Sequence, residues 1–167
     1  SSADKVTGDN LSYTQTAAFA DKNAGAAKLV NVSAVALAGT DAGNYDLQNT
    51  TASTTANIAQ KALTASYTAT DRTYDGTTGV TVSGSSSDII TNDVVNFSQS
   101  AALASKNAGT QTVNISNIAL AGADAGNYAL QSTTTTTTAN IAKATLTGIT
   151  GITASNKTYD GNAMATL

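Results

Sequence analysis

A tandem repeat of about 83 residues constrains this chain more than any other feature of its sequence. Four short motifs each occur twice, in the same order and at nearly the same offset. They are Lys22–Gly25 with Lys106–Gly109, Ala36–Tyr45 with Ala119–Tyr128, Ala56–Ala59 with Ala139–Ala142, and Thr73–Gly76 with Thr158–Gly161. A repeat of this length is typical of arrays in which each unit packs mainly against its neighbours in sequence.

The repeat predicts a division of the 167 residues into three parts. Residues 1–71 form the back part of a first repeat, residues 72–156 a complete central repeat, and residues 157–167 the front part of a third. Because Ser1–Asp4 align with Ser85–Asp88, we expect a window cut from a longer array. The alternative is a fibre subunit whose segment 144–167 supplies the strands missing before Ser1 in the next copy.

Apolar and polar residues alternate in several stretches, as they do in half-buried strands. Val95 and Phe97 show this alternation in the second copy, and so do Val113 and Ile115. The phase then slips, which predicts a bulge near Asn117 that returns Ile118 and Leu120 to the core. The first copy repeats the pattern and the slip.

The remaining local signals agree with strands and turns. Threonine-rich runs at 49–55 and 132–138 favour strands because threonine is β-branched, and Ala101–Ser105 is compatible with one helical turn. Turns are predicted where Gly, Asn and Asp tolerate unusual backbone angles. These turn residues are Asp75, Gly76, Asp160, Gly161, Gly43, Asn44, Tyr45, Gly126, Asn127 and Tyr128.

The sequence therefore predicts an all-β fold, with elongated antiparallel β-domains of about 83 residues placed end to end in a rod. The segment Ala139–Thr147 joins one repeat to the next and contains neither Gly nor Pro. Read as a continuous strand, it predicts a stiff joint. The residues expected at the two equivalent joints are Asn57, Ile58, Leu63, Asn140, Ile141 and Leu146.

Composition excludes several functions. The net charge is −3 and the eight basic residues are scattered, whereas a nucleic-acid partner needs a basic surface. No apolar run is long enough to insert this segment into a membrane. His, Cys and Glu are absent, so the usual general bases and nucleophiles are missing and we expect no enzyme activity and no cofactor.

At the level of motifs, the chain resembles the YDG-type β-repeats of large bacterial surface adhesins, including haemagglutinin-like proteins. The motifs that carry the resemblance are Lys106–Gly109, Gly122–Tyr128, Ala139–Lys143 and Lys157–Gly161. One departure is Arg72, which replaces the first Lys of the last motif. The resemblance covers essentially the whole chain and implies a secreted or surface-displayed array, often in biofilms, with no established catalytic residues to carry over.

From the residues and the resemblance together, we expect a non-catalytic structural repeat of a secreted bacterial adhesin or extracellular filament. It would form a rod or stalk for surface attachment or for cohesion between cells. Its partners would be neighbouring repeats or copies of itself, with a host or matrix glycan as a further partner. The alternatives are a glycan-binding adhesin module and a fibre subunit that assembles by strand complementation.

Three weaker site hypotheses remain. Carboxylates in turns are candidate calcium ligands, namely Asp41, Asp46, Asp75, Asp124 and Asp160, although ordinary turn chemistry is the plainer interpretation. The tyrosines of the repeated motifs are candidate sugar-stacking groups or, more simply, anchors for turns. Lys22 and Lys106 are candidates for isopeptide bonds, or for salt bridges beside a turn.

Overall fold

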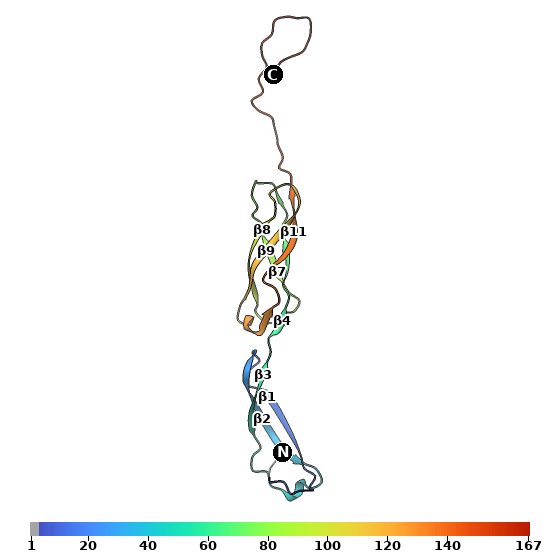
Figure 1. The fold of residues 1–167 in the computed structure, drawn as a ribbon, viewed down its shortest axis with the longest axis vertical. Coiled ribbons are helices and arrows are strands. Elements are labelled where there is room, and N and C mark those ends of the chain that lie inside the picture. The colour runs from blue at the N-terminus through green and yellow to red at the C-terminus, as the bar shows by residue number, and fades with distance from the viewer. Residues whose placement is uncertain (1–3) are drawn as a thin grey trace.

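The computed structural model describes residues 4–167 and is built from β-strands with two short 3-10 helices (Figure 1). The elements are β1 (Ser12–Phe19), β2 (Gly25–Ala38), η1 (Ala42–Asn44), β3 (Ala52–Ile58), β4 (Lys61–Leu63), β5 (Ser66–Ala69), β6 (Arg72–Thr73), β7 (Val82–Ser85), β8 (Asn96–Leu103), β9 (Gly109–Ala121), η2 (Ala125–Asn127), β10 (Tyr128–Leu130) and β11 (Thr135–Ala142). The predicted all-β class is confirmed. No helix among the described residues is long and apolar enough to span a bilayer.

The strands form four sheets. Their orders are β1-β2-β3, β10-β4, β6-β11-β9-β8 and β5-β7. Most strand pairs are antiparallel, but two pairs are parallel: β4 with β10, and β6 with β11. The predicted antiparallel domains are therefore corrected at two places in the second unit, where β4 and β6 run alongside strands of the same direction.

The sequence repeat is also a structural repeat. β1, β2 and β3 correspond to β8, β9 and β11, and each β-hairpin contains one register shift at the same place. The extra residue lies in the longer strand, where Ala34 and Asn117 have φ of 51° and 54°. The predicted bulge near Asn117 is confirmed: Ile115 and Ile118 are both buried. The predicted correspondence of residues 1–3 lies outside the described residues.

We call residues 4–58 the first unit and residues 61–142 the second unit. The second unit has a closed core, because Tyr67 of β5 and Val82 of β7 pack against its main sheet. Tyr67 meets Phe97 edge to face, with ring centroids 6.2 Å apart. The central repeat was predicted to begin at residue 72, which lies after β4 and β5. In the structure, β4 pairs with β10 and β5 pairs with β7, so both strands pair with strands that come after residue 72.

The first unit lacks such a covering layer over its β1-β2-β3 sheet. Val113 and Ile115 are buried in the second unit, whereas their counterparts Val30 and Val32 are only half-buried. Phe19 is 41% exposed, against 4% for its counterpart Leu103. The same sheet is therefore covered in one unit and open in the other.

Three local predictions need correction. The joint is not one continuous strand, because β3 ends at Ile58 and β4 begins at Lys61, where the chain leaves one sheet and joins another. The threonine-rich runs become strands only from Ala52 and Thr135 onward. The Ala101–Ser105 stretch is not helical, since its first three residues belong to β8.

Candidate functional site: the joint between the two units

A loop of the first unit contacts the end of the second unit. We call Lys22–Ala24, the turn between β1 and β2, the docking loop. We call Asp93, Asp124 and Asn127 the receiving end. The Lys22 Nζ lies 2.8 Å from Asp93 Oδ1 and 3.2 Å from Asp124 Oδ1, so one ammonium group bridges two carboxylates.

Amide groups add directional contacts to this ion pair. The Ala24 backbone N–H donates to Asn127 Oδ1 at 2.9 Å, and Asn127 Nδ2 donates to Asn23 Oδ1 at 3.4 Å. In the short connection between β3 and β4, Gln60 Nε2 donates to the Gly126 carbonyl at 2.9 Å. The Asp-Ala-Gly-Asn turn of the second unit is therefore a contact surface as well as a turn.

The receiving end is fixed from within its own unit. The Tyr128 hydroxyl accepts from the Ile90 backbone N–H at 2.8 Å and donates to Asp93 Oδ2 at 2.8 Å. The Val94 backbone N–H donates to Asp124 Oδ2 at 2.8 Å. Each carboxylate therefore turns one oxygen to its own unit and the other to Lys22, so its orientation is set before the loop arrives.

Electrostatics keep these groups charged. Hydrogen bonds from Lys22 and then Tyr128 hold the pKa of Asp93 below its ordinary value, and the carboxylates of Asp93 and Asp124 raise the pKa of Lys22. The Asp93 side chain is only 8% exposed, whereas that of Lys22 is 69% exposed. Because solvent screens an exposed ammonium, we assign this pair mainly to orienting the units.

Packing supplies the apolar part of the joint. Leu63 is fully buried, and β4 pairs in register with β10, placing Leu63 opposite Leu130. The Gln131 N–H donates to the Leu63 carbonyl at 3.0 Å, and the Thr64 N–H donates to Asp88 Oδ2 at 2.8 Å. The segment that leaves the first unit is thus built into the second.

The first unit carries its own copy of the receiving end. The Tyr45 hydroxyl accepts from the Val6 N–H at 3.0 Å and donates to Asp9 Oδ2 at 2.5 Å. The Asn10 N–H donates to Asp41 Oδ2 at 2.7 Å. Among residues 4–167, no lysine or arginine forms an ion pair with Asp9 or Asp41.

Comparison with known families identifies this repeat. The family model described as the YDG domain matches residues 1–54 and 59–137. The chain belongs to the YDG domain family. No curated protein matches the chain, and no solved structure does. The first matched stretch of the YDG domain ends within β3, and the second begins at Ala59, directly after β3.

The Tyr-Asp-Gly motifs of this YDG chain form turns away from the joint. Asp75 accepts from the Thr77 N–H and from Arg72, and the hydrogen bonds from Thr77, followed by the charge of Arg72, lower the pKa of Asp75. Asp160 likewise accepts from Lys157 and from the Asn162 N–H. Gly76 and Gly161 have φ of 80° and 75°, which accounts for the glycine in each motif.

The calcium candidates are dispersed. Asp41 and Asp124 each accept a backbone N–H, Asp46 accepts from Gln48 at 3.1 Å, and Asp75 and Asp160 hold their own turns. Within the described part of the chain, no three acidic, histidine or cysteine side chains come together around one point. The candidates are therefore turn ligands rather than a preassembled cation site.

The tyrosines do not form one platform. Tyr128 is buried and Tyr45 half-buried, whereas Tyr74 and Tyr159 are exposed on other turns. Isopeptide chemistry is disfavoured at Lys22, because condensation needs a neutral amine and a protonated carboxyl. Instead, the neighbouring groups raise the pKa of Lys22 and lower the pKa of Asp93, which favours a charged amine and an ionised carboxylate.

The remaining predicted joint residues lie either at the end of β3, beside the joint, or at the equivalent place after the second unit, at the end of β11. The Asn57 side chain accepts from the Ala27 N–H at 2.8 Å, and Ile58 is half-buried. At the far end of the second unit, the Asn140 N–H donates to Asp71 at 2.7 Å and Ile141 is buried. Leu146 is 91% exposed.

Sequence reasoning missed four participants: Asn23, Ala24, Gln60 and Asp93. The signal was available for three of them. The Lys-Asn-Ala-Gly motif, which contains Asn23 and Ala24, recurs without change, and a turn alone does not require its lysine. Asp93 likewise has an identical counterpart, Asp9, in the first copy of the repeat. Gln60 has no such signal, because its counterpart in the repeat is Lys143.

Proposed function

We propose that this chain is a non-catalytic structural segment of a secreted bacterial adhesin or extracellular filament, in which YDG domains follow one another as a rod. The observation that carries the proposal is the joint. Lys22, Asn23 and Ala24 of one unit are held by Asp93, Asp124 and Asn127 of the next. Leu63, which follows the connection between the units, is fully buried in the second unit.

Stiffness follows from how the two units are connected. Only Ala59 and Gln60 separate β3 from β4, and Gln60 is itself hydrogen-bonded across the joint. Flexible linkers are rich in Gly and Ser, and neither residue occurs in this connection. Units fixed in this way transmit force along the array and hold a distal adhesive region away from the cell surface.

The adhesin setting rests on the resemblance to bacterial surface repeats. An antibody raised against this chain tests it on intact cells of the bacterium that makes the protein. Gold labelling of surface projections, removed by brief external protease treatment, is the expected result. Labelling confined to permeabilised cells would contradict the proposal.

Glycan binding is the second candidate function, and one feature favours it. A hollow of about 370 Å³ opens at the joint and is lined by Lys22, Lys61, Asp93, Asn127 and Tyr128, among others. This volume falls within the range of ligand sites, and polar groups line it beside an aromatic ring. Selective binding on a glycan array, lost in Lys61→Ala, would favour this function over a purely structural one.

A further inference from the structure

One triplet of the form Asn-x-Ser occupies the same position in both units. It is residues 31–33 on β2 and residues 114–116 on β9. Each triplet comes directly before the residue of positive φ at the bulge, Ala34 in one unit and Asn117 in the other. An asparagine followed two residues later by serine or threonine is the acceptor signal for N-linked sugars.

Strand geometry turns each acceptor asparagine away from the core. The middle residue of the second triplet, Ile115, is 2% exposed and belongs to the core, and Val32 is its counterpart in the first unit. Because side chains alternate along a strand, Asn31 and Asn114 lie on the opposite face of the sheet. Both asparagines are exposed there.

Neither asparagine has a visible role in folding. Asparagine is depleted in strands, yet Asn31 and Asn114 lie on interior strands of their sheets. Their side-chain amides form no hydrogen bond among the described residues. Asn57 provides the contrast, because its side chain accepts from the Ala27 N–H at 2.8 Å. The repeated asparagine therefore needs an explanation other than the fold.

The surroundings of each acceptor leave room for a sugar. Its cross-strand neighbours are small in both units, namely Ala102 and Thr136 beside Asn114, and Ala18 and Ser53 beside Asn31. A hollow of about 410 Å³ adjoins the second acceptor and is lined by residues 114–116 and 134–136. This volume suits a small ligand, and threonine hydroxyls can donate to and accept from the hydroxyl groups of a sugar.

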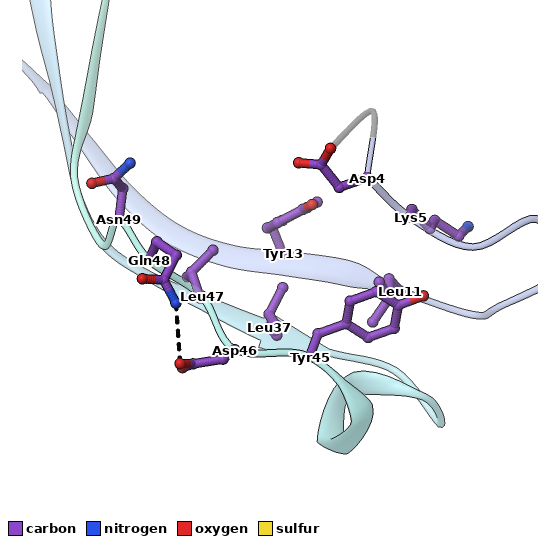
Figure 2. Close-up of a pocket in the computed structure, with 10 residues that line it drawn as sticks. All are labelled: Asp4, Lys5, Leu11, Tyr13, Leu37, Tyr45, Asp46, Leu47, Gln48 and Asn49. Atoms are coloured by element: carbon purple, nitrogen blue, oxygen red, sulfur yellow. Dashed lines mark hydrogen bonds between the residues drawn. The ribbon is translucent and has the colours of Figure 1, made fainter.

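The four other triplets of this kind are not repeated. They begin at Asn10, Asn49, Asn96 and Asn156, whose counterparts are Val94, Ser132, Ser12 and Asp71. Asn49, for example, lies in the loop after η1, beside Gln48 in the lining of a groove of the first unit (Figure 2). Chance accounts for isolated triplets in a chain rich in Asn, Ser and Thr. It accounts less well for one that is kept in both units while a neighbouring residue changes from Leu29 to Thr112.

We propose that Asn31 and Asn114 are acceptors of N-linked sugars. The donor is a sugar activated by a phosphate ester at its anomeric carbon. The asparagine Nδ2 forms a bond to this carbon, the bond from the carbon to the phosphate oxygen breaks, the phosphate leaves with the electron pair, and one amide proton is released. Because β2 and β9 are paired on both sides, the transfer takes place before the chain folds.

The sugars would hydrate a rod that carries few charges. Only 11% of the residues are charged, and N-linked sugars are bulky, solubilising surface groups. One sugar on the outward sheet face of each unit would recur along the array with the period of the repeat. The inference does not rest on the proposed function, because it concerns the surface of each unit and not the joint.

Mass spectrometry of the protein isolated from the bacterium that makes it tests the proposal. Cleavage after lysine gives peptides 29–61 and 107–143, each of which contains one of the two acceptors. Electron-transfer fragmentation keeps the sugar attached and locates the modified residue. We expect a mass increase of one or more sugar residues at Asn31 and at Asn114. Asn140, an exposed asparagine of the same sheet followed by Ile and Ala, is the internal control and is expected to be unmodified.

Ser116→Ala, expressed in the same bacterium, separates recognition of the triplet from nonspecific attachment of sugar. The Ser116 hydroxyl forms no hydrogen bond among the described residues, so the variant should fold, which circular dichroism checks. The modification at Asn114 is expected to disappear, whereas that at Asn31 persists. Modification of Asn114 that survives this substitution would overturn the proposal.

Unmodified Asn31 and Asn114 in the native protein overturn the proposal, and so do sugars attached to threonine side chains alone. Either result leaves the proposed function separately testable, because a fixed distance between the two units depends on the joint and not on a sugar.

Discussion

Replacing Leu63 by Ala tests the apolar part of the joint, because the sequence repeat provides a matched control. Leu63 is fully buried, whereas its counterpart Leu146 is 91% exposed. Truncating a buried leucine to alanine costs about 2–5 kcal/mol, comprising the lost transfer free energy and the cavity left behind. A change of 1 kcal/mol shifts the Tm of a domain of this size by roughly 4–8 °C, so we expect Leu63→Ala to lower the Tm by about 8 °C or more.

Leu146→Ala at concentrations where the chain is monomeric should change the free energy of unfolding by less than about 0.5 kcal/mol, since little surface is removed from contact. Urea unfolding followed by far-ultraviolet circular dichroism measures both variants. The chain has no Trp and six Tyr, so tyrosine fluorescence, to which Tyr67 in the core contributes, provides the second probe. Equal destabilisation by the two substitutions would refute the burial of β4, the segment that enters the second unit, against β10 at Leu63.

Three further predictions concern the receiving end and the docking loop. Gly122→Ala should lower the free energy of unfolding by about 1–3 kcal/mol, because Gly122 has a φ of 109° and an added Cβ would lie 2.4 Å from the Val94 carbonyl oxygen. Gly126→Ala in the same loop is the control, because an added Cβ there meets nothing within 4 Å. Urea unfolding should show almost no change for this control. Tyr128→Phe should lower the Tm, because the Ile90 N–H and the Asp93 carboxylate each lose a hydrogen-bond partner; an unchanged Tm would contradict this. Lys22→Met should widen the distribution of distances between the units, and the difference in Tm from the wild type should depend on pH.

The sign of that pH dependence follows from the two shifts. The pKa of Asp93 is held below 3.8 in the folded protein, so its stabilising contribution is present above that value and is lost as the pH falls through the folded pKa. The pKa of Lys22 is raised above 10.5, so its contribution is present below that value and is lost as the pH rises through the raised pKa. The Tm difference should therefore be flat from about pH 5 to 9 and shrink in acid. A difference that grows in acid would contradict the ion pair.

Sequence reasoning reached the strands and the repeat because both leave local signals. Alternation at Val113 and Ile115 marks a buried face, and the phase slip located the bulge at Asn117. It did not reach the parallel pairing of β4 with β10, because strand direction depends on where the chain returns. The break at Ala59 and Gln60 was missed for the same reason, since no local residue signals a change of sheet.

The joint was only partly predictable. Leu63 was expected there because the connecting segment contains no Gly or Pro and reads as a continuous strand. The docking of Lys22 on Asp93 and Asp124 was not expected, because residues more than 70 positions apart in sequence meet only once the units are stacked. The repetition of Lys-Asn-Ala-Gly indicated a turn, and a turn accounts for Gly25. It does not account for the lysine, whose partners the sequence did not identify.

The central claim is that two YDG units are held in one fixed arrangement by the joint. Because the chain has no Cys, spin labels can be placed specifically at Thr55→Cys and Thr136→Cys, on exposed positions of β3 and β11. Pulsed electron paramagnetic resonance then measures the distance between the units. We predict one narrow distance distribution, which broadens when Lys22→Met and Asn127→Ala are introduced together. A broad distribution in the otherwise unaltered chain would contradict the account.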